Sequence, residues 1–81
     1  MKLPRDISGK QLASALRILG YTVTRQSGSH MRLTSLQGGV EHHITIPAHV
    51  PLKTGTLGAL LAEVADARGW TREELLKQIR L

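Results

Sequence analysis

Residues 6–20, DISGKQLASALRILG, hold a helix start, a buried stripe and a helix stop within one short segment. Ser8 can cap the first turn, and Gln11, three residues later, completes an S-x-x-Q capping box. The apolar residues that follow recur at the spacing of one helical face and are Leu12, Ala15, Leu16 and Leu19. Gly20 supplies the left-handed residue at which helices commonly end. The segment therefore predicts an amphipathic helix with one buried face.

Three segments that alternate between apolar and polar residues come next: YTVTRQ, HMRLTSL and VEHHITI. Such alternation is typical of strands with one buried and one solvated face. In the first segment, Tyr21 and Val23 share one face, and Thr22 and Thr24 share the other. In the second segment, Met31 and Leu33 face the core, while the residues that face solvent are His30, Arg32 and Thr34. SGS and QGG are turn-forming links, and Pro47 ends the third strand. The short links predict an antiparallel meander.

Two further helices are predicted after the strands. Residues 54–69 carry a second apolar stripe before Gly69, made by Leu57, Leu60, Leu61 and Val64. Thr71 and Glu74 then form a T-x-x-E capping box, and Trp70 can pack on Leu75 across the start of the last helix. Leu76 and Ile79 would pack this last helix against the rest of the domain. The expected fold is a single α+β domain over residues 1–81, with two layers and the order α-β-β-β-α-α. Its helices cover one face of a three-stranded antiparallel sheet.

The charge of the chain is unevenly distributed. Its formal net charge is +5, and residues 1–53 hold seven Lys or Arg against two Asp or Glu, whereas residues 54–81 hold four of each. All four histidines also fall in the first two-thirds. A positive field concentrated in this way favours a polyanion such as nucleic acid, and the plainer alternative is a solvated basic surface without a dedicated partner.

Composition narrows the class of protein further. The chain has no cysteine, which removes disulfide and thiol chemistry and makes a structural zinc site unexpected. No apolar run approaches the roughly 18 residues that a membrane-spanning helix needs, and the start of the chain lacks the apolar core of a signal peptide. A cytoplasmic location is therefore expected.

His30 is the residue best suited to chemistry. If the link Ser27-Gly28-Ser29 is a tight hairpin, Arg25 comes near His30 at the strand end, and Arg32 follows on the same solvated face. A glycine-rich bend also offers backbone N–H groups to an anion. Cleavage of RNA by its own 2′-hydroxyl needs one proton removed and one delivered, and an imidazole of pKa about 6.5 can do either. Arginines can stabilise the phosphoryl charge, so neither a metal nor a cofactor is required. The alternative is a polar residue tolerated at a strand edge.

The segment LKTGTL offers a second phosphate signal. Lys53 and Thr54 lie at the start of the second predicted helix, where unpaired N–H groups and the helix dipole attract phosphate. The equally weighted alternative is a plain helix cap.

The other histidines give weaker signals. His42 and His43 are adjacent on a strand, so they point to opposite faces and cannot bind one metal from one face. A zinc site that combines them with His49 is not expected. His49, in PAHVP, is either a turn residue or a second member of the His30 site, and the sequence also leaves open whether Tyr21 assists.

In order and spacing, these segments resemble the HicA family of small toxins from bacterial and archaeal toxin–antitoxin systems. The resemblance is carried by SGKQLASALRILGY, RQSGSHMRL, ITIPAHVPLKTGTLGALL and WTREELL, which together cover nearly the whole chain. It implies a fold similar to double-stranded RNA-binding domains and a ribosome-independent endoribonuclease activity on mRNA, with His30 of GSH at the catalytic position. It also implies a HicB-type antitoxin that covers the active face. One departure is LGALLAEVADARGW, which is longer and richer in alanine than the family pattern and leaves the docking of the last helix open.

The leading hypothesis from the sequence is thus a metal-independent, mRNA-cleaving toxin. Arg25, Arg32 and Lys53 would hold RNA phosphates, with Thr54 at the helix start, and the Ser27-Gly28-Ser29 bend would orient His30 as general acid or base. The alternative is a non-catalytic module that grips structured RNA by shape and phosphate contacts. A third reading is a protein-interaction module whose basic face meets an acidic partner.

Overall fold

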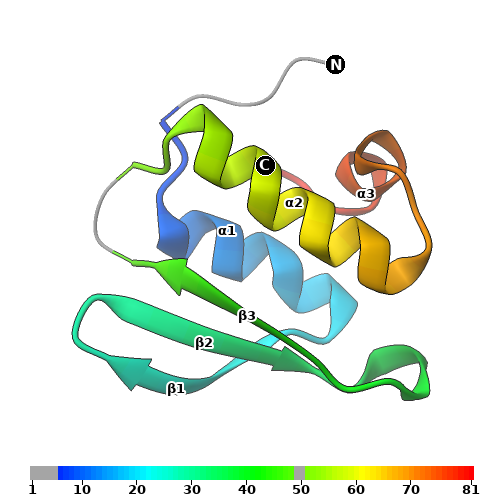
Figure 1. Cartoon of the computed structure of the whole chain (residues 1–81), viewed down its shortest axis with the longest axis horizontal. Helices are drawn as coiled ribbons and strands as arrows, with labels where there is room; N and C mark the ends of the chain where they lie inside the picture. The colour runs from blue at the N-terminus through cyan, green and yellow to red at the C-terminus, as the bar shows by residue number, and fades with distance from the viewer. Residues whose placement is uncertain (1–5, 49–50) are drawn as a thin grey trace.

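The computed structural model describes residues 6–48 and 51–81, which form a three-stranded sheet with helices on one side of it (Figure 1). The elements in chain order are α1 (Gly9–Leu16), the 3-10 turn η1 (Arg17–Leu19), β1 (Thr22–Ser27), β2 (His30–Ser35), the 3-10 turn η2 (Gln37–Gly39), β3 (His42–Pro47), α2 (Thr54–Arg68) and α3 (Arg72–Gln78). The predicted fold class and the order α-β-β-β-α-α are confirmed. Within the described ranges, no helix is long and apolar enough to cross a membrane.

Local signals set the ends of the helices. The Ser8 side chain accepts from the Gln11 N–H while the Gln11 side chain accepts from the Ser8 N–H, and Thr71 and Glu74 repeat this arrangement at α3. Both capping boxes are therefore formed as predicted. The first helix tightens after Leu16 into η1 before it stops at Gly20, whose φ is 83°. A 3-10 last turn is a common way to use the final carbonyl groups of a helix.

The sheet is a simple meander with the order β1-β2-β3, and both pairings are antiparallel. Met31 and Leu33 on β2 are buried against the helices, whereas His30 and Arg32 are exposed, as the alternation predicts. β1 is less regular: all six of its residues are exposed, and Val23, which lies opposite buried Leu33, stays 48% exposed. An edge strand that the helices cover incompletely explains this exposure.

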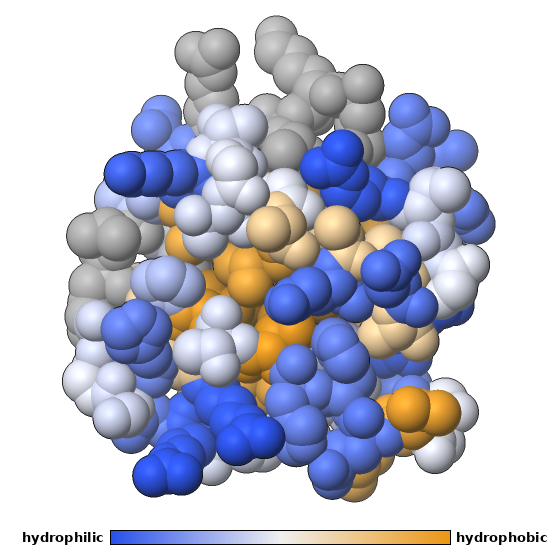
Figure 2. All heavy atoms as spheres, viewed as in Figure 1, coloured by the Kyte–Doolittle hydropathy of each residue, from blue (hydrophilic) through white to orange (hydrophobic). Residues whose placement is uncertain are grey.

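The core lies between the sheet and the helical layer. Figure 2 shows apolar side chains at the centre of the molecule and mainly hydrophilic side chains along its lower side, over the strands, with some apolar ones at the lower right. The predicted stripe of α2 is buried, and Leu75 and Ile79 of the α3 region are 0% and 3% exposed. The last helix is thus docked on the core despite the alanine-rich segment before it. Fully buried members of the core include Leu12, Leu16, Tyr21, Leu33, Ile46, Leu61 and Val64.

Arg68 ties four segments together at one end of the molecule. Its guanidinium donates to the Leu19 carbonyl, to the Ser35 hydroxyl at 3.1 Å and to the Gln37 carbonyl at 3.3 Å. Ser35, which is 1% exposed, also donates to the Leu19 carbonyl at 2.8 Å. One side chain from the end of α2 therefore fixes the ends of η1 and β2 and the start of η2.

At the opposite end, α1 touches the end of β3 through a glycine. A Cβ placed on Gly9 would lie 1.7 Å from the carbonyl oxygen of Pro47. Pro47 is in turn the cross-strand partner of His30. The start of the first helix thus supports the strand end beside which His30 lies.

Candidate functional site

The side of the sheet that faces away from the helices, here called the outer face, carries most of the predicted site. Its first row across the strands is Ser27, His30 and Pro47, and its second is Arg25, Arg32 and Thr45; its third row is Thr22, Thr34 and His43. Residues paired across antiparallel strands project on the same side, so each row presents its side chains together. His30, Arg25 and Arg32 are all exposed on this face.

A β-bulge brings Arg25 to the outer face. The register shifts between Val23 and Arg25, so that Val23 pairs with Leu33 while Arg25 pairs with Arg32. With strict alternation, Arg25 would share the helix-facing side of Val23. The extra residue, Thr24, also points outward, because its hydroxyl bonds to the Thr34 hydroxyl at 2.9 Å. Such bulges redirect side chains, and strict alternation along the sequence carries no sign of this one.

The predicted hairpin is present. Ser27 pairs with His30 around the two-residue loop Gly28-Ser29. Gly28 has a φ of 57°, a left-handed value that favours glycine, and nothing lies within 4 Å of a Cβ placed on it. The Ser29 carbonyl accepts a hydrogen bond from the Ala48 N–H at 2.6 Å, which anchors the loop to the end of β3. His30 is therefore the first residue of β2, held on a fixed backbone.

The two arginines bring unpaired positive charge beside His30. Arg25 and Arg32 lie directly opposite each other, and like charges in that position are unfavourable in a sheet. Within residues 6–48 and 51–81, neither arginine has a carboxylate partner; the Glu41 carboxylate bonds instead to His43 Nε2 at 2.8 Å. A bound phosphate would relieve this repulsion, because a guanidinium matches phosphate oxygens in shape and charge.

A chain of hydrogen bonds crosses the same face further along. The Thr24 hydroxyl bonds to Thr34, the Thr34 hydroxyl bonds to His43 Nδ1 at 2.7 Å, and His43 Nε2 bonds to the Glu41 carboxylate at 2.8 Å. The sequence predicts the outward orientation of His43 and gives no sign of these hydrogen bonds. The chain of bonds runs from β1 through β2 to β3 and Glu41, so periodicity within one segment could not identify this arrangement.

Lys53 and Thr54 lie at the start of α2, in the helical layer and not on the sheet (Figure 1). Lys53 is the N-cap of α2 and makes no capping hydrogen bond with its side chain. An open groove of about 670 Å³ runs from Arg32, His43 and Thr45 over β3 to Gly55 and Thr56 in the first turn of α2, with Ile44, Ala59, Leu60 and Glu63 completing its lining. This groove joins the outer face to the start of α2, while Lys53 and Thr54 themselves do not line it.

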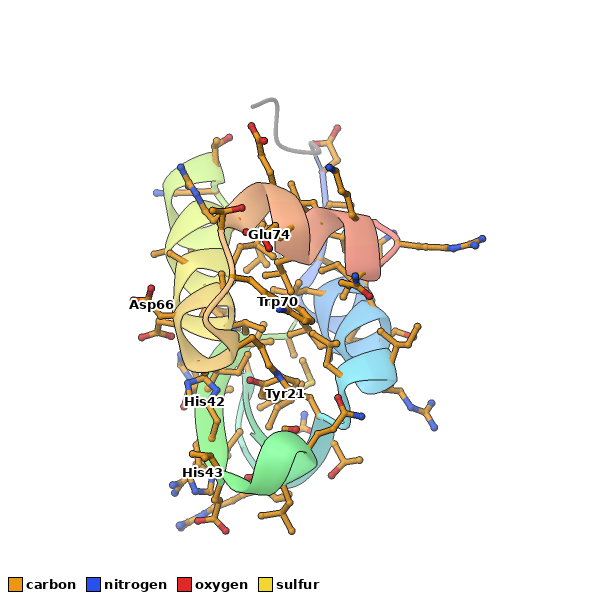
Figure 3. The ribbon with its side chains drawn as sticks, turned by 90° about the vertical axis from the view of Figure 1, so that its right-hand side faces the viewer. Tyr21, His42, His43, Asp66, Trp70 and Glu74 are labelled. Atoms are coloured by element: carbon orange, nitrogen blue, oxygen red, sulfur yellow. The ribbon has the colours of Figure 1, made fainter. Side chains whose placement is uncertain are left out.

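Among the described residues, the other residue that the sequence suggested for the site does not lie on the outer face. Tyr21 is fully buried on the helix-facing side, where its hydroxyl bonds to His42 Nδ1 at 2.6 Å. Figure 3 shows these two rings between the layers and His43 below them, so the prediction that His42 and His43 point to opposite faces is confirmed. Burial raises the pKa of Tyr21 above its ordinary value, and the nearby Arg68 guanidinium partly opposes this. His49 lies outside the described residues. Among those that are described, no group of three or more His, Asp or Glu side chains is arranged to hold a metal ion.

Fold and site together define a small α+β domain whose open sheet face carries an exposed histidine and two arginines without a carboxylate partner among residues 6–48 and 51–81. Residues 9–81 match the family described as HicA toxin of bacterial toxin-antitoxin, and the chain belongs to this family. The match covers nearly the whole chain and confirms the resemblance in the sequence. Membership makes the protein a toxin of a toxin–antitoxin system and implies a cognate antitoxin partner. Neither a curated protein nor a solved structure gives a significant match.

Proposed function

We propose that this toxin is an endoribonuclease that cleaves mRNA on the outer face of its sheet, with His30 as the proton-transfer group. The observation that carries the proposal is the exposed His30 beside the Arg25–Arg32 pair, which has no carboxylate partner within the described ranges. The family adds support, since its members are toxins. An mRNA substrate places the activity in the cytoplasm.

The proposed reaction is an internal transfer within RNA. The 2′-hydroxyl loses its proton and attacks the adjacent phosphorus, the bond from phosphorus to the 5′-oxygen breaks, and that oxygen takes up a proton. The products are a 2′,3′-cyclic phosphate and a 5′-hydroxyl. His30 exchanges one of the two protons, a role that typically contributes about 10²–10⁴-fold to the rate. Arg25 and Arg32 stabilise the negative charge on the non-bridging oxygens.

The hairpin and the start of α2 have supporting roles in this proposal. The backbone of Ser27, Gly28 and Ser29 holds His30 in place and offers N–H groups to a phosphate. Lys53 and Thr54 bind a more distant phosphate of the same strand, which would reach them over β3 along the groove past Thr45. No metal is assigned a role: His30 exchanges one of the two protons, solvent water exchanges the other, and Arg25 and Arg32 stabilise the phosphoryl charge.

A HicB-type antitoxin is proposed as the partner, and it would inhibit by covering the outer face. Such a partner would present carboxylates to Arg25 and Arg32, because these two residues are cross-strand neighbours of like charge. Binding of the antitoxin and of RNA would then be mutually exclusive.

The test compares the parent with His30→Ala on a long single-stranded RNA in EDTA. We expect cleavage to fall by at least about 10²-fold in the variant. The free energy of unfolding, measured by thermal unfolding, should change by less than about 0.5 kcal/mol, because the side chain is exposed. Cleavage at the parental rate by His30→Ala would contradict the proposal.

Arg32→Ala and Arg72→Ala form a matched pair for the phosphate contacts. Both remove one exposed positive charge, but Arg72 lies on α3 in the helical layer. RNA binding should weaken as salt rises, and the slope of that dependence should drop by about one for Arg32→Ala and stay unchanged for Arg72→Ala. Retention of RNA without fragments in the parent protein would favour the non-catalytic binding module instead.

A further inference from the structure

His43 is a histidine whose two ring nitrogens are both engaged by the protein. Nδ1 lies 2.7 Å from the Thr34 hydroxyl and Nε2 lies 2.8 Å from the Glu41 carboxylate. Thr34 is itself held by Thr24 at 2.9 Å, so the chain of bonds begins on β1, passes through β2 and β3 and ends at Glu41, just before β3. These contacts fix the plane of the ring and leave no nitrogen for a ligand. What a ligand can still reach is the flat surface of the imidazole, since the side chain is 34% exposed.

The protein offers very few other rings to a nucleic acid. It has one tyrosine, one tryptophan and no phenylalanine. Tyr21 is fully buried, and Trp70 packs against the core on the helical side (Figure 3). Proteins that bind single-stranded RNA stack its bases on aromatic or histidine rings and on arginine planes. On the outer face, that role falls to the histidines and the two arginines.

The surroundings of His43 separate a base site from a phosphate site. A shallow depression of about 490 Å³ is lined by Thr24, Arg25, Arg32, Thr34, Glu41 and His43. The arginines on one side attract phosphate, whereas the Glu41 carboxylate on the other repels it. An RNA strand across this depression is therefore oriented with its backbone toward the arginines and a base toward the imidazole.

We propose that the His43 imidazole is a fixed stacking platform for one nucleobase of the RNA that this toxin binds. Pro47 of β3 lies opposite His30 of β2, and His43 lies four residues before Pro47 on β3. By strand geometry, His43 is therefore about 14 Å from His30. The stacked base thus lies away from the scissile phosphate and helps to hold the strand in register. The inference rests on the proposed RNA substrate and does not require His30 to be catalytic.

The test measures RNA binding in a His30→Ala background, where the RNA stays intact. The probe is a short single-stranded RNA with 2-aminopurine at successive positions, whose fluorescence falls when the base is stacked. His43→Leu and His43→Phe both lose the bonds to Thr34 and Glu41, but only Phe presents a flat ring. We expect His43→Leu to bind about 5–150-fold more weakly and to lose the fluorescence change. His43→Phe should bind within about threefold of the parent and retain it.

Two results would overturn the inference. Equal binding by His43→Leu and the parent would show that no base rests on the ring. Equal losses in His43→Leu and His43→Phe, with both variants folded by thermal unfolding, would assign His43 to the hydrogen-bond chain alone. The failure of the proposed function can be told apart from the failure of the stacking site. If RNA binds to none of these proteins and the parent does not cleave it, both proposals are wrong. If the parent cleaves RNA and the His43 variants bind it normally, only the stacking site falls.

Discussion

The close contact between Gly9 and Pro47 predicts that Gly9→Ala is among the most damaging single-methyl changes in the protein. The added Cβ would lie 1.7 Å from the Pro47 carbonyl oxygen and 2.9 Å from Ile46 Cγ2. Cβ contacts under 3.0 Å essentially do not occur, so α1 and β3 would have to separate by at least 1.3 Å there. The obstacle is backbone, so no side-chain rotation can relieve it.

Overpacking of a core commonly costs about 1–3 kcal/mol, and a clash with backbone belongs at the top of that range. We therefore expect Gly9→Ala to lower the free energy of unfolding by about 3 kcal/mol. For a domain of 81 residues this corresponds to a fall of about 12–24 °C in Tm. Urea unfolding followed by circular dichroism would measure the free energy, and differential scanning calorimetry would measure Tm.

Gly55→Ala is the matched control, because Gly55 also lies in the first turn of a helix. Nothing lies within 4 Å of a Cβ placed on Gly55, and alanine is the better helix former. This variant should be as stable as the parent or up to about 1 kcal/mol more stable. A Gly9→Ala protein within about 0.5 kcal/mol of the parent would refute the argument, because it would mean that α1 does not rest on the end of β3.

Two further predictions concern the buried side of the sheet. Because burial raises the pKa of Tyr21, the folded protein keeps this proton to higher pH than the unfolded chain does. The resulting stabilisation is fully present below the ordinary tyrosine pKa of about 10 and is lost as pH rises through the folded-state pKa. The Tm of Tyr21→Phe should therefore fall less than the Tm of the parent when the pH is raised from about 9 to about 11. Parallel Tm curves over this range would contradict the burial argument. Arg68→Met should lower the free energy of unfolding by about 2 kcal/mol, because charged hydrogen bonds to the Leu19 and Gln37 carbonyls and to Ser35 are lost. Arg72→Met, with an exposed side chain, is the control in the same urea titration and should change by less than about 0.5 kcal/mol.

The elements that the sequence predicts correctly are those whose signals are local. Each capping box lies within four consecutive residues, and each apolar stripe repeats within one helix, so Ser8, Thr71 and the buried face of α2 could be identified without the fold. The alternation of β2 is equally local and correctly assigns His30 and Arg32 to the solvated side. The family resemblance follows from the same segments, in their order.

What could not be predicted depends on contacts between distant segments. The bulge between Val23 and Arg25 is a property of how two strands pair, and it alone turns Arg25 outward. Arg68 carries no signal beyond its place in the last turn of α2, although it binds residues 31–49 positions away. The support of His43 by Thr34 and Glu41 likewise exists only once β2 and β3 are aligned.

Alternation along β2 has a consequence for how such a toxin can change over time. The inward-facing residues of β2 are buried in the fold and stabilise it; they are Met31, Leu33 and Ser35. The residues that alternate with them contribute little to stability; they are His30, Arg32 and Thr34. Substitutions at the second set can alter what the surface binds and still leave a folded protein. Ligand preference and inhibitor fit are therefore open to rapid divergence on an architecture that stays the same.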